Sequence, residues 1–295
     1  MLEARLEQGQ ILKKIVDAIK DLIDSANFDC TSTGISLQAM DSSHVSLVTL
    51  LLRDDGFEHF RCDRNISLGI PIEQLCKILK CAGNEDVITL KAKDGGETVS
   101  FMFENKNQTR ISHFSLKLMD IDTEHLGIPD TEYKCTVKLP SAQLQKICKE
   151  MAIIGDTISI SASKEGVKFS CTGETGTGSI ICKQNSGSSK DDEEDSVSIR
   201  LEEKINLTFA LRYLTSFTKA TPLSKFVVLK LSPDVPLTVE YHLGEKENDI
   251  GHLRFYLAPK IEEEGKEKEK ESQEEEDGKR KEKEKGEEES GENEE

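Results

Sequence analysis

The sequence has no tryptophan, few prolines and no long apolar run. Its longest apolar stretches are like Val48–Leu52, whereas a membrane-spanning helix needs roughly 18 consecutive apolar residues. The first residues, Met1–Glu7, include acidic side chains where a secretory signal would place an apolar segment. We therefore expect a soluble protein that remains inside the cell and has no membrane partner.

The sequence also lacks paired cysteines and metal-binding motifs. No two cysteines form a C-x-x-C pair, and no histidine stands at metal-ligand spacing from them. Scattered cysteines in an intracellular chain are typical of reduced thiols that are buried or half-buried. We therefore expect no metal and no cofactor. The cysteines interpreted as free thiols are Cys30, Cys62, Cys76, Cys81, Cys135, Cys148, Cys171 and Cys182.

Motifs of common catalytic sites are absent as well. The glycine-rich segment Gly173–Gly178 lacks the Lys-Ser/Thr pair that completes a phosphate-binding loop, and its surroundings have a strand-like pattern. The six histidines show no arrangement with Ser and Asp, or with Cys, that would activate a nucleophile. The sequence therefore predicts a protein without catalytic activity.

Positive charge is scarce. The formal net charge is −17, and residues 262–295 hold 18 acidic against 8 basic side chains, a net of −10 that leaves −7 for residues 1–261. The tail has no apolar periodicity, so it cannot bury enough surface to offset its ordering entropy, and we expect it to be disordered. A body this acidic repels nucleic acid as a whole. A DNA-binding function therefore requires that basic residues gather on one surface.

Alternation of apolar and polar residues is the commonest pattern in the body of the chain. Every second residue is apolar in segments such as Gly34–Met40, Thr98–Glu104 and Ile158–Ser163. This period of two indicates half-buried strands of antiparallel sheets. Two polar stretches, 186–195 and 244–249, predict exposed loops between strands.

Only four segments have helical periodicity, and each follows a short strand. The predicted helices are Gly9–Leu22, Pro71–Lys80, Pro140–Ala152 and Phe209–Ala220, two of which begin at a proline, where proline is tolerated. Successive helices are spaced by about 63 to 70 residues, which indicates an internal repeat. The chain therefore contains two similar domains, each with two strand–helix–strand units. The predicted boundaries are 1–118 and 136–261 for the domains, 119–135 for the connector and 262–295 for the tail.

All four helices carry basic residues outside their apolar arcs. In the third, Lys146 and Lys149 stand three residues apart, clear of the apolar position Ile147. Solvation of an outer face explains one such helix, but random outer faces in a chain of net charge −17 would be mainly acidic. Lysines on a common surface, without aromatic residues for base stacking, suit sequence-independent contact with duplex phosphates. The residues predicted to face DNA are Lys13, Lys14, Lys20, Lys77, Lys80, Lys146, Lys149, Arg212 and Lys219.

Several runs of residues resemble a known family. They are Gln38–Leu47, Lys77–Asp86, Leu126–Pro129, Thr208–Leu214, Thr218–Leu223 and Tyr256–Ile261. These runs occur in order and are similar to segments of the proliferating cell nuclear antigen family, the eukaryotic sliding clamps of DNA polymerases. The similarity extends from Met1 to Ile261.

The resemblance implies an α+β fold with two similar clamp domains, each of antiparallel sheets with two helices. It implies a homotrimeric ring whose helices line a central hole around double-stranded DNA, which is held topologically and without sequence specificity. The implied function is that of a nuclear processivity factor for replicative DNA polymerase and a docking platform for replication and repair proteins. The implied partners are further copies of the chain, DNA polymerases, the clamp loader and proteins with a short glutamine-plus-aromatic docking motif.

Three sets of site residues follow from the resemblance. The connector would lie over a hydrophobic docking pocket, with matching positions Met40, His44, Val45, Leu47, Leu126, Ile128, Pro129, Tyr133, Pro236, Tyr256, Leu257 and Ala258. The trimer would close through the edge strands Thr109–Lys117 and Thr175–Lys183, with interface residues Arg110, Phe114, Leu116, Thr177, Ser179 and Ile181. Lys164 matches the lysine that receives ubiquitin in the family, although a lone lysine in a turn is commonly just exposed to solvent.

A second interpretation is a subunit of the heterotrimeric ring of the DNA-damage checkpoint. The Leu126–Pro129 motif and both edge strands favour the self-assembling clamp, and the molecular mass of the purified protein separates the two. The chain departs from the family in three ways. Ile153 stands where a polar or basic residue is common, the loops near 186–195 and 244–249 are longer than usual, and a tail follows Ile261.

Overall fold

The computed structural model describes residues 1–122, 126–128, 131–184, 196–233, 235–245 and 248–260. The predicted tail, the whole predicted loop 186–195 and the pocket position Pro129 therefore lie outside the described residues. Contacts divide the chain after Pro259, and all elements below belong to the unit Met1–Pro259.

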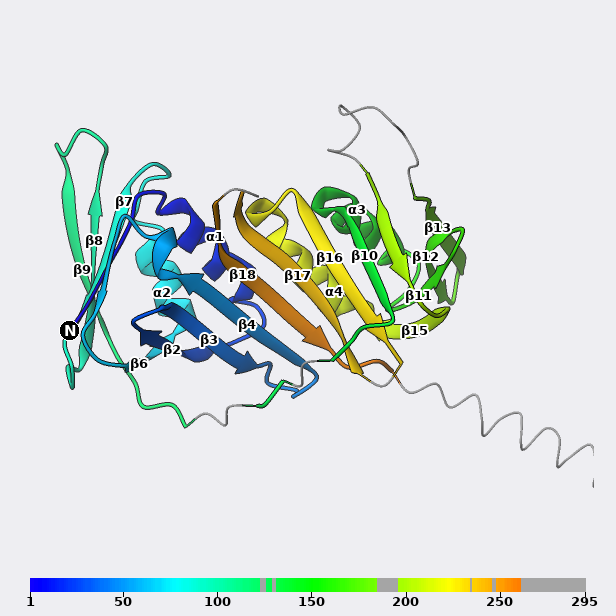
Figure 1. Ribbon diagram of the computed structural model, residues 1–295, viewed down its shortest axis with the longest axis horizontal. Coiled ribbons are helices and arrows are strands. Elements are labelled where there is room, and N and C mark those ends of the chain that lie inside the picture. The colour runs from blue at the N-terminus through cyan, green and yellow to red at the C-terminus, as the bar shows by residue number, and fades with distance from the viewer. Residues whose placement is uncertain (123–125, 129–130, 185–195, 234, 246–247, 261–295) are drawn as a thin grey trace, which may run out of the picture. The chain divides into compact units, whose positions relative to one another are not determined.

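The strands form three antiparallel sheets (Figure 1). The five-stranded sheet has the order β5 (His59–Cys62), β1 (Leu2–Leu6), β7 (Val87–Ala92), β8 (Thr98–Glu104) and β9 (Ile111–Lys117). The nine-stranded sheet has the order β14 (Ser198–Leu201), β10 (Cys135–Pro140), β16 (Phe226–Ser232), β17 (Val235–Glu245), β18 (Asn248–Leu257), β4 (Ser46–Arg53), β3 (Gly34–Met40), β2 (Ser25–Thr31) and β6 (Ile66–Pro71). The four-stranded sheet has the order β13 (Gly176–Cys182), β12 (Gly166–Gly173), β11 (Thr157–Ser163) and β15 (Ile205–Ala210).

The predicted strands Gly34–Met40 and Thr98–Glu104 are confirmed with the same bounds as β3 and β8. Burial alternates along β8 and, from Ile35 onward, along β3, because one face packs on the core and the other faces outward. The predicted loop 244–249 is wrong in part. Strand β17 continues to Glu245 and β18 begins at Asn248, so the two strands form a hairpin through most of that stretch.

One continuous sheet joins the two halves of the chain, which the sequence pattern did not predict. Strands β4 and β18 pair from Ser46 opposite Leu257 to Leu52 opposite Gly251. Gly251 has φ +142°, and a Cβ there would lie 1.9 Å from the carbonyl oxygen of Leu51. Only glycine therefore lets the two strands approach at this end of the pairing.

The described residues contain the α-helices α1 (Gln10–Ile19), α2 (Ile72–Leu79), α3 (Ser141–Met151) and α4 (Leu211–Phe217), with short 3-10 helices η1 (Asp54–Gly56) and η3 (Thr218–Leu223). All four predicted helices are confirmed, with shifted ends. Pro71 and Pro140 stand immediately before α2 and α3 in extended conformation. The fourth begins later than predicted, because Phe209 and Ala210 belong to β15, and it continues as η3.

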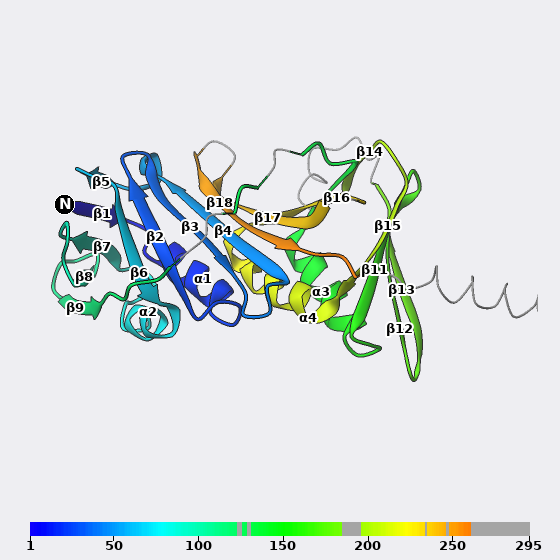
Figure 2. The ribbon, with the colours of Figure 1, turned by 90° about the horizontal axis from the view of Figure 1, so that it is seen from below.

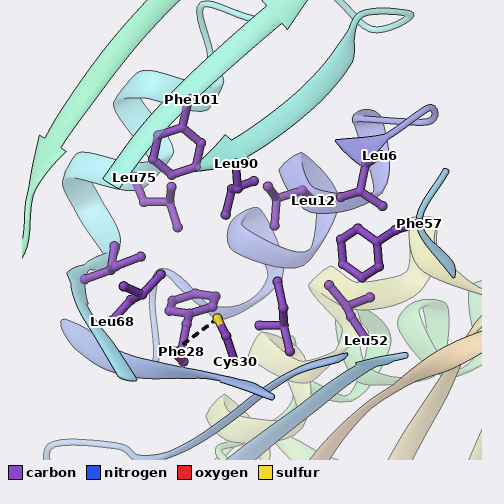
Figure 3. A pocket seen from close by; sticks show the side chains of 12 residues that line it. Leu6, Leu12, Phe28, Cys30, Leu52, Phe57, Leu68, Leu75, Leu90 and Phe101 are labelled. Carbon is purple, nitrogen blue, oxygen red and sulfur yellow. Dashed lines mark hydrogen bonds between the residues drawn. The ribbon is translucent and has the colours of Figure 1, made fainter. Parts of the chain in front are cut away.

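The core of the N-terminal half lies between its two sheets and its two helices (Figure 3). Leu12 of α1 and Leu75 of α2 meet Leu90 and Phe101 of the five-stranded sheet and Phe28 of the nine-stranded sheet around a small, wholly apolar cavity. The helices are thus held by burial of one apolar face, which leaves the opposite face free for charged residues.

The cysteines are free thiols in the structure. Six are buried, Cys62 is half-buried and Cys81 is exposed. Burial raises the pKa of the Cys30 and Cys148 thiols to about 12 and that of Cys135 to about 11. These thiols are therefore packing groups. In the part of the chain that the structure describes, no helix is long and apolar enough to span a membrane.

Candidate DNA-facing and docking surfaces

The four helices form one layer on the same side of the nine-stranded sheet (Figure 2). Helix α1 contacts α2, α4 and η3, and α3 contacts α4 and η3. Their buried residues, such as Ile15, Leu75, Leu144 and Leu214, point into the core. The side chains predicted to face DNA lie outside these buried stripes, and the structure leaves all nine of them half-buried or exposed.

Four of the nine bases form ion pairs within the helix layer. Three pairs are local: Lys20 with Asp17 at 2.7 Å, Lys77 with Glu73 at 2.7 Å, and Lys146 with Glu150 at 3.8 Å. The fourth joins the two halves, because Lys219 of η3 pairs with Asp21 just after α1. Exposed pairs of this kind stabilise a fold little. They do neutralise part of the basic charge that the sequence suggested.

The remaining five bases carry the positive excess of the layer. Lys13 donates to the carbonyl oxygen of Ala82 at 2.6 Å, which ties α1 to the end of α2. The other four make no ion pair with any residue that the structure describes. They are Lys14, Lys80, Lys149 and Arg212, one on or next to each helix. Ile153 is 83 % exposed just after α3 and adds no charge there.

Apolar side chains form a row on the opposite face of the nine-stranded sheet. Met40 pairs with Leu47 across β3 and β4, and Leu47 pairs with Tyr256 across β4 and β18. Thr238 of β17 continues the row beside Tyr256. Leu257 faces the other way and is 0 % exposed, so its side chain belongs to the core. Although it is one of the predicted pocket residues, its side chain cannot contact a partner directly.

The described residues of the segment between β9 and β10 lie on this same face. The amide of Asn27 donates to the Ile121 carbonyl at 2.9 Å. The amide of Gln38 donates to the Leu126 carbonyl at 3.0 Å and accepts from the Leu126 N–H at 2.8 Å. The Tyr133 hydroxyl lies 2.7 Å from that of Thr238. These bonds hold the connector beside the row of Met40, Leu47 and Tyr256.

The described residues of the predicted pocket differ in exposure. Leu126 and Ile128 are 42 % and 40 % exposed, which is high for large apolar side chains. His44, Pro236 and Ala258 are also exposed, whereas Met40, Val45, Leu47 and Tyr133 are half-buried and Tyr256 is 9 % exposed. The surface therefore combines an apolar floor with exposed apolar side chains at its rim.

The turn Asp41–Ser46, which we name the docking turn, carries several pocket residues and is fixed by one carboxylate. Asp41 Oδ1 accepts from the N–H groups of Val45 at 2.9 Å and Ser46 at 2.6 Å, and Oδ2 accepts from the N–H of Ser43 at 3.0 Å. Burial alone would raise the pKa of Asp41, but these backbone bonds outweigh it and lower the pKa. They also hold His44 in the left-handed region, at φ 56°.

Comparison with known families shows which family this geometry belongs to. The family model of the proliferating cell nuclear antigen N-terminal domain matches residues 1–125, and that of the C-terminal domain matches residues 127–260. The chain belongs to the proliferating cell nuclear antigen family. It therefore has the α+β clamp fold with two clamp domains, and it is a sliding-clamp protein whose family binds DNA and acts in replication as a processivity factor. Family membership also indicates a non-catalytic protein.

Within this clamp fold, β9 and β13 are edge strands at the ends of the five-stranded and four-stranded sheets (Figure 1). Ile111 and Ile181 are 50 % and 56 % exposed on them. Of the predicted interface residues, Arg110, Thr177, Ser179 and Ile181 are exposed or half-exposed along these edges. Phe114 is half-buried and Leu116 is 9 % exposed, because both point toward the core of their own sheet.

The hydrogen-bond pattern shows which backbone groups of β9 are free. Backbone bonds from Asn105 to Arg110 and from Leu118 to Glu97 mark bonded pairs of the β8–β9 ladder. Bonded and non-bonded pairs alternate along an antiparallel ladder, and this alternation places Ser115 in a non-bonded pair. The N–H of Ser115 therefore points away from β8, to the open edge. The two-residue hairpin between β12 and β13 closes on the bonded pair Gly173 and Gly176. By the same alternation Ser179 lies in a non-bonded pair, and its N–H points to the open edge of β13.

Lys164 is exposed in the two-residue turn between β11 and β12. The Ser163 hydroxyl accepts from the Glu165 N–H at 3.2 Å and orders this turn. No described contact holds the Lys164 side chain, which leaves its amine accessible.

Sequence reasoning missed several side chains that position these surfaces. Gln38, Asp41 and Tyr213 are among them, and so is Glu240, a 3 % exposed carboxylate that pairs with Lys230, His242 and Arg254. The spacing of Asp41 before Ser43 is typical of a side chain that caps its own turn, so this signal was present. The partners of Gln38 and Glu240 are distant in sequence, and no local pattern indicates them.

Proposed function

We propose that this chain forms a homotrimeric ring around duplex DNA, serves as processivity factor for a replicative polymerase, and docks replication and repair proteins on its outer face. The observation that carries the proposal is the excess of bases on a single helix layer in a protein of net charge −17. Lys14, Lys80, Lys149 and Arg212 stand without an acidic partner among the described residues, one on or next to each helix. Such bases attract phosphates without reading sequence.

Two open edges support assembly of the ring from identical chains. Edge strands β9 and β13 present unpaired backbone groups, and half-exposed isoleucines Ile111 and Ile181 accompany them. Two different edges on one chain suit a head-to-tail contact, which closes into a ring when its rotation permits. Pairing of β9 with β13 of a neighbouring copy would satisfy both edges and cover both isoleucines.

The connector supports docking of partner proteins. Leu126 and Ile128 remain 42 % and 40 % exposed although hydrogen bonds from Gln38 hold the connector at the sheet. A partner that inserts apolar or aromatic side chains between these residues and Met40, Leu47 and Tyr256 would remove this surface from water. A glutamine-plus-aromatic motif has the required chemistry.

The alternative is a subunit of a heterotrimeric checkpoint clamp, which has the same domain fold. The two proposals differ in self-assembly. Light scattering on the pure, full-length protein should give three times the mass of one chain. A monomer at all tested concentrations would refute the homotrimer and favour a subunit that needs other chains.

Two further proposals complete this function. We place the protein in the nucleus, where a replication clamp meets its DNA. We also propose Lys164 as an acceptor of ubiquitin, since its amine is exposed in a short turn. Mass spectrometry of the protein isolated from cells with DNA damage would test this; a Lys164 that stays unmodified under such conditions contradicts it.

A further inference from the structure

The docking turn is bonded to a helix from the other half of the chain. The Tyr213 hydroxyl, on α4, donates to Asp41 Oδ2 at 3.1 Å. Tyr213 and Asp41 are 6 % and 5 % exposed, so water competes little for this bond. The bond therefore fixes the docking turn against the helix layer, across the thickness of the sheet.

Asp41 is the residue through which a change at Tyr213 would reach the pocket. Its Oδ2 accepts from the Ser43 N–H and the Tyr213 hydroxyl, whereas Oδ1 accepts from Val45 and Ser46. Without the hydroxyl, Oδ2 would keep only the Ser43 N–H among these donors. The carboxylate could then rotate, and a buried acceptor that loses a donor costs free energy. The pocket residue Val45 is tied to the same carboxylate, and its carbonyl accepts from the Ala258 N–H at 3.3 Å.

Arg212 lies at the other end of the same chain of hydrogen bonds. Its Nη2 donates to the Tyr213 hydroxyl oxygen at 3.3 Å, and its guanidinium carbon lies 4.9 Å from the centre of the Tyr213 ring. A cation that donates to a hydroxyl oxygen polarises the O–H bond and strengthens its donation to a carboxylate. Arg212 is also among the bases proposed to contact DNA.

We propose that Tyr213 is a positioning residue of the docking turn, and that the chain Arg212, Tyr213, Asp41 links the DNA-facing layer to the docking pocket. The consequence for partners rests on the proposed docking function. The order of the turn itself does not, since it can be measured without a partner.

The test compares Tyr213→Phe with Tyr241→Phe in the full-length protein. Both variants lose one phenolic oxygen from a buried ring, but the Tyr241 hydroxyl lies near Thr221 of η3, and no described hydrogen bond joins it to the docking turn. Amide hydrogen exchange at Val45 and Ser46 reports the turn. A synthetic peptide with the glutamine-plus-aromatic motif reports the pocket.

Tyr213→Phe should speed exchange of the Val45 and Ser46 amides about three- to tenfold and weaken the peptide by a similar factor, the usual range for one lost hydrogen bond. Tyr241→Phe should change neither. Arg212→Gln should give a smaller change in the same direction. If exchange and affinity are the same in Tyr213→Phe and wild type, or if exchange rises evenly over residues 135–257, the positioning role is refuted. If wild type binds no peptide, the docking function fails, and the exchange at Val45 and Ser46 alone decides the role of Tyr213.

Discussion

Gln38 binds the backbone of Leu126 through both polar atoms of its side-chain amide. Its Nε2 donates to the Leu126 carbonyl oxygen at 3.0 Å, and its Oε1 accepts from the Leu126 N–H at 2.8 Å. A single side chain of β3 thus sets the distance between the connector and the apolar row of the sheet. Asn27 and Tyr133 hold the connector on either side of this point. The proposed docking pocket is therefore built from two segments whose spacing depends on a few polar contacts.

Gln38→Ala should weaken the docking peptide about three- to tenfold, because each partly exposed hydrogen bond contributes roughly 0.5 to 1.5 kcal/mol at most. Gln38→Glu keeps an acceptor for the Leu126 N–H but cannot donate, so it should lie between Ala and wild type. Isothermal calorimetry measures both.

Replacement of Leu126 and Ile128 together by Ala should weaken peptide binding by about 1 to 3 kcal/mol, as for truncated anchors. Unchanged peptide affinity in all three variants would contradict the pocket.

Ser115→Pro and Ser179→Pro should each give monomers. Each proline removes an N–H that points to an open edge and leaves the bonds of the chain's own sheet in place. Ser115→Ala and Ser179→Ala keep the N–H and serve as controls. Light scattering that reports a trimer for both proline variants would show that β9 and β13 do not form the contact between copies.

Replacement of Lys14, Lys80, Lys149 and Arg212 by Gln should weaken binding to open linear DNA. The slope of log affinity against log salt should fall by about one for each of these bases that contacts a phosphate. A control variant with Arg64, Lys93, Lys164 and Lys204 changed to Gln has the same net charge as this variant, but its substitutions lie in loops and turns away from the helices. Both should melt close to wild type, since exposed substitutions cost about 0.5 kcal/mol or less. Equal loss of DNA affinity in the two variants would mean that only net charge matters.

His242 and His252 are cross-strand neighbours with opposite pKa shifts. A hydrogen bond to Glu240 raises the pKa of His242, whereas burial, with Arg254 close by, lowers the pKa of His252 to about 4. Between the pKa of about 6.5 in the unfolded chain and about 4 in the folded chain, the unfolded chain protonates His252 and the folded chain does not. The free energy of unfolding therefore decreases as the pH is lowered through this range. For His242 the stabilisation is present below about 6.5 and is lost as pH rises through the folded pKa.

These signs lead to a paired experiment. When the pH is lowered from about 7 to about 5, the melting temperature should fall less in His252→Asn than in wild type, and it should fall more in His242→Asn. Glu240 remains ionised throughout, because its three basic neighbours outweigh the effect of burial and hold its pKa far below the usual range. The same pH response in both variants would contradict the assigned shifts.

The sequence predicted the elements well because their signals are local. Alternation in Gly34–Met40 and the apolar arc of α1 both depend on residues close in the chain. The pairing of β4 with β18 could not be predicted, since an alternating strand shows which face is buried but not which strand lies beside it.

The candidate surfaces follow the same division. The Lys77 and Glu73 pair stands at helical spacing and was visible in the sequence, but Lys219 and Asp21 meet only through the packing of η3 on α1. In the pocket, Tyr256 and Leu257 are adjacent, so the alternation of a strand already implies that only one of them faces outward. The positions of Gln38 and Tyr213 required the folded structure.

The central claim is that the protein holds DNA by encircling it, and one measurement tests this directly. Labelled protein is loaded by a clamp loader on nicked circular DNA, the salt is raised, and the DNA is then linearised with a nuclease. High salt should abolish binding to linear DNA, because the exposed bases contact phosphates weakly. At the same salt concentration a ring should stay on the circle, because it is closed around the DNA. It should leave only when the circle is cut. Equal loss before and after cutting would show that the protein grips DNA from one side and would contradict the account.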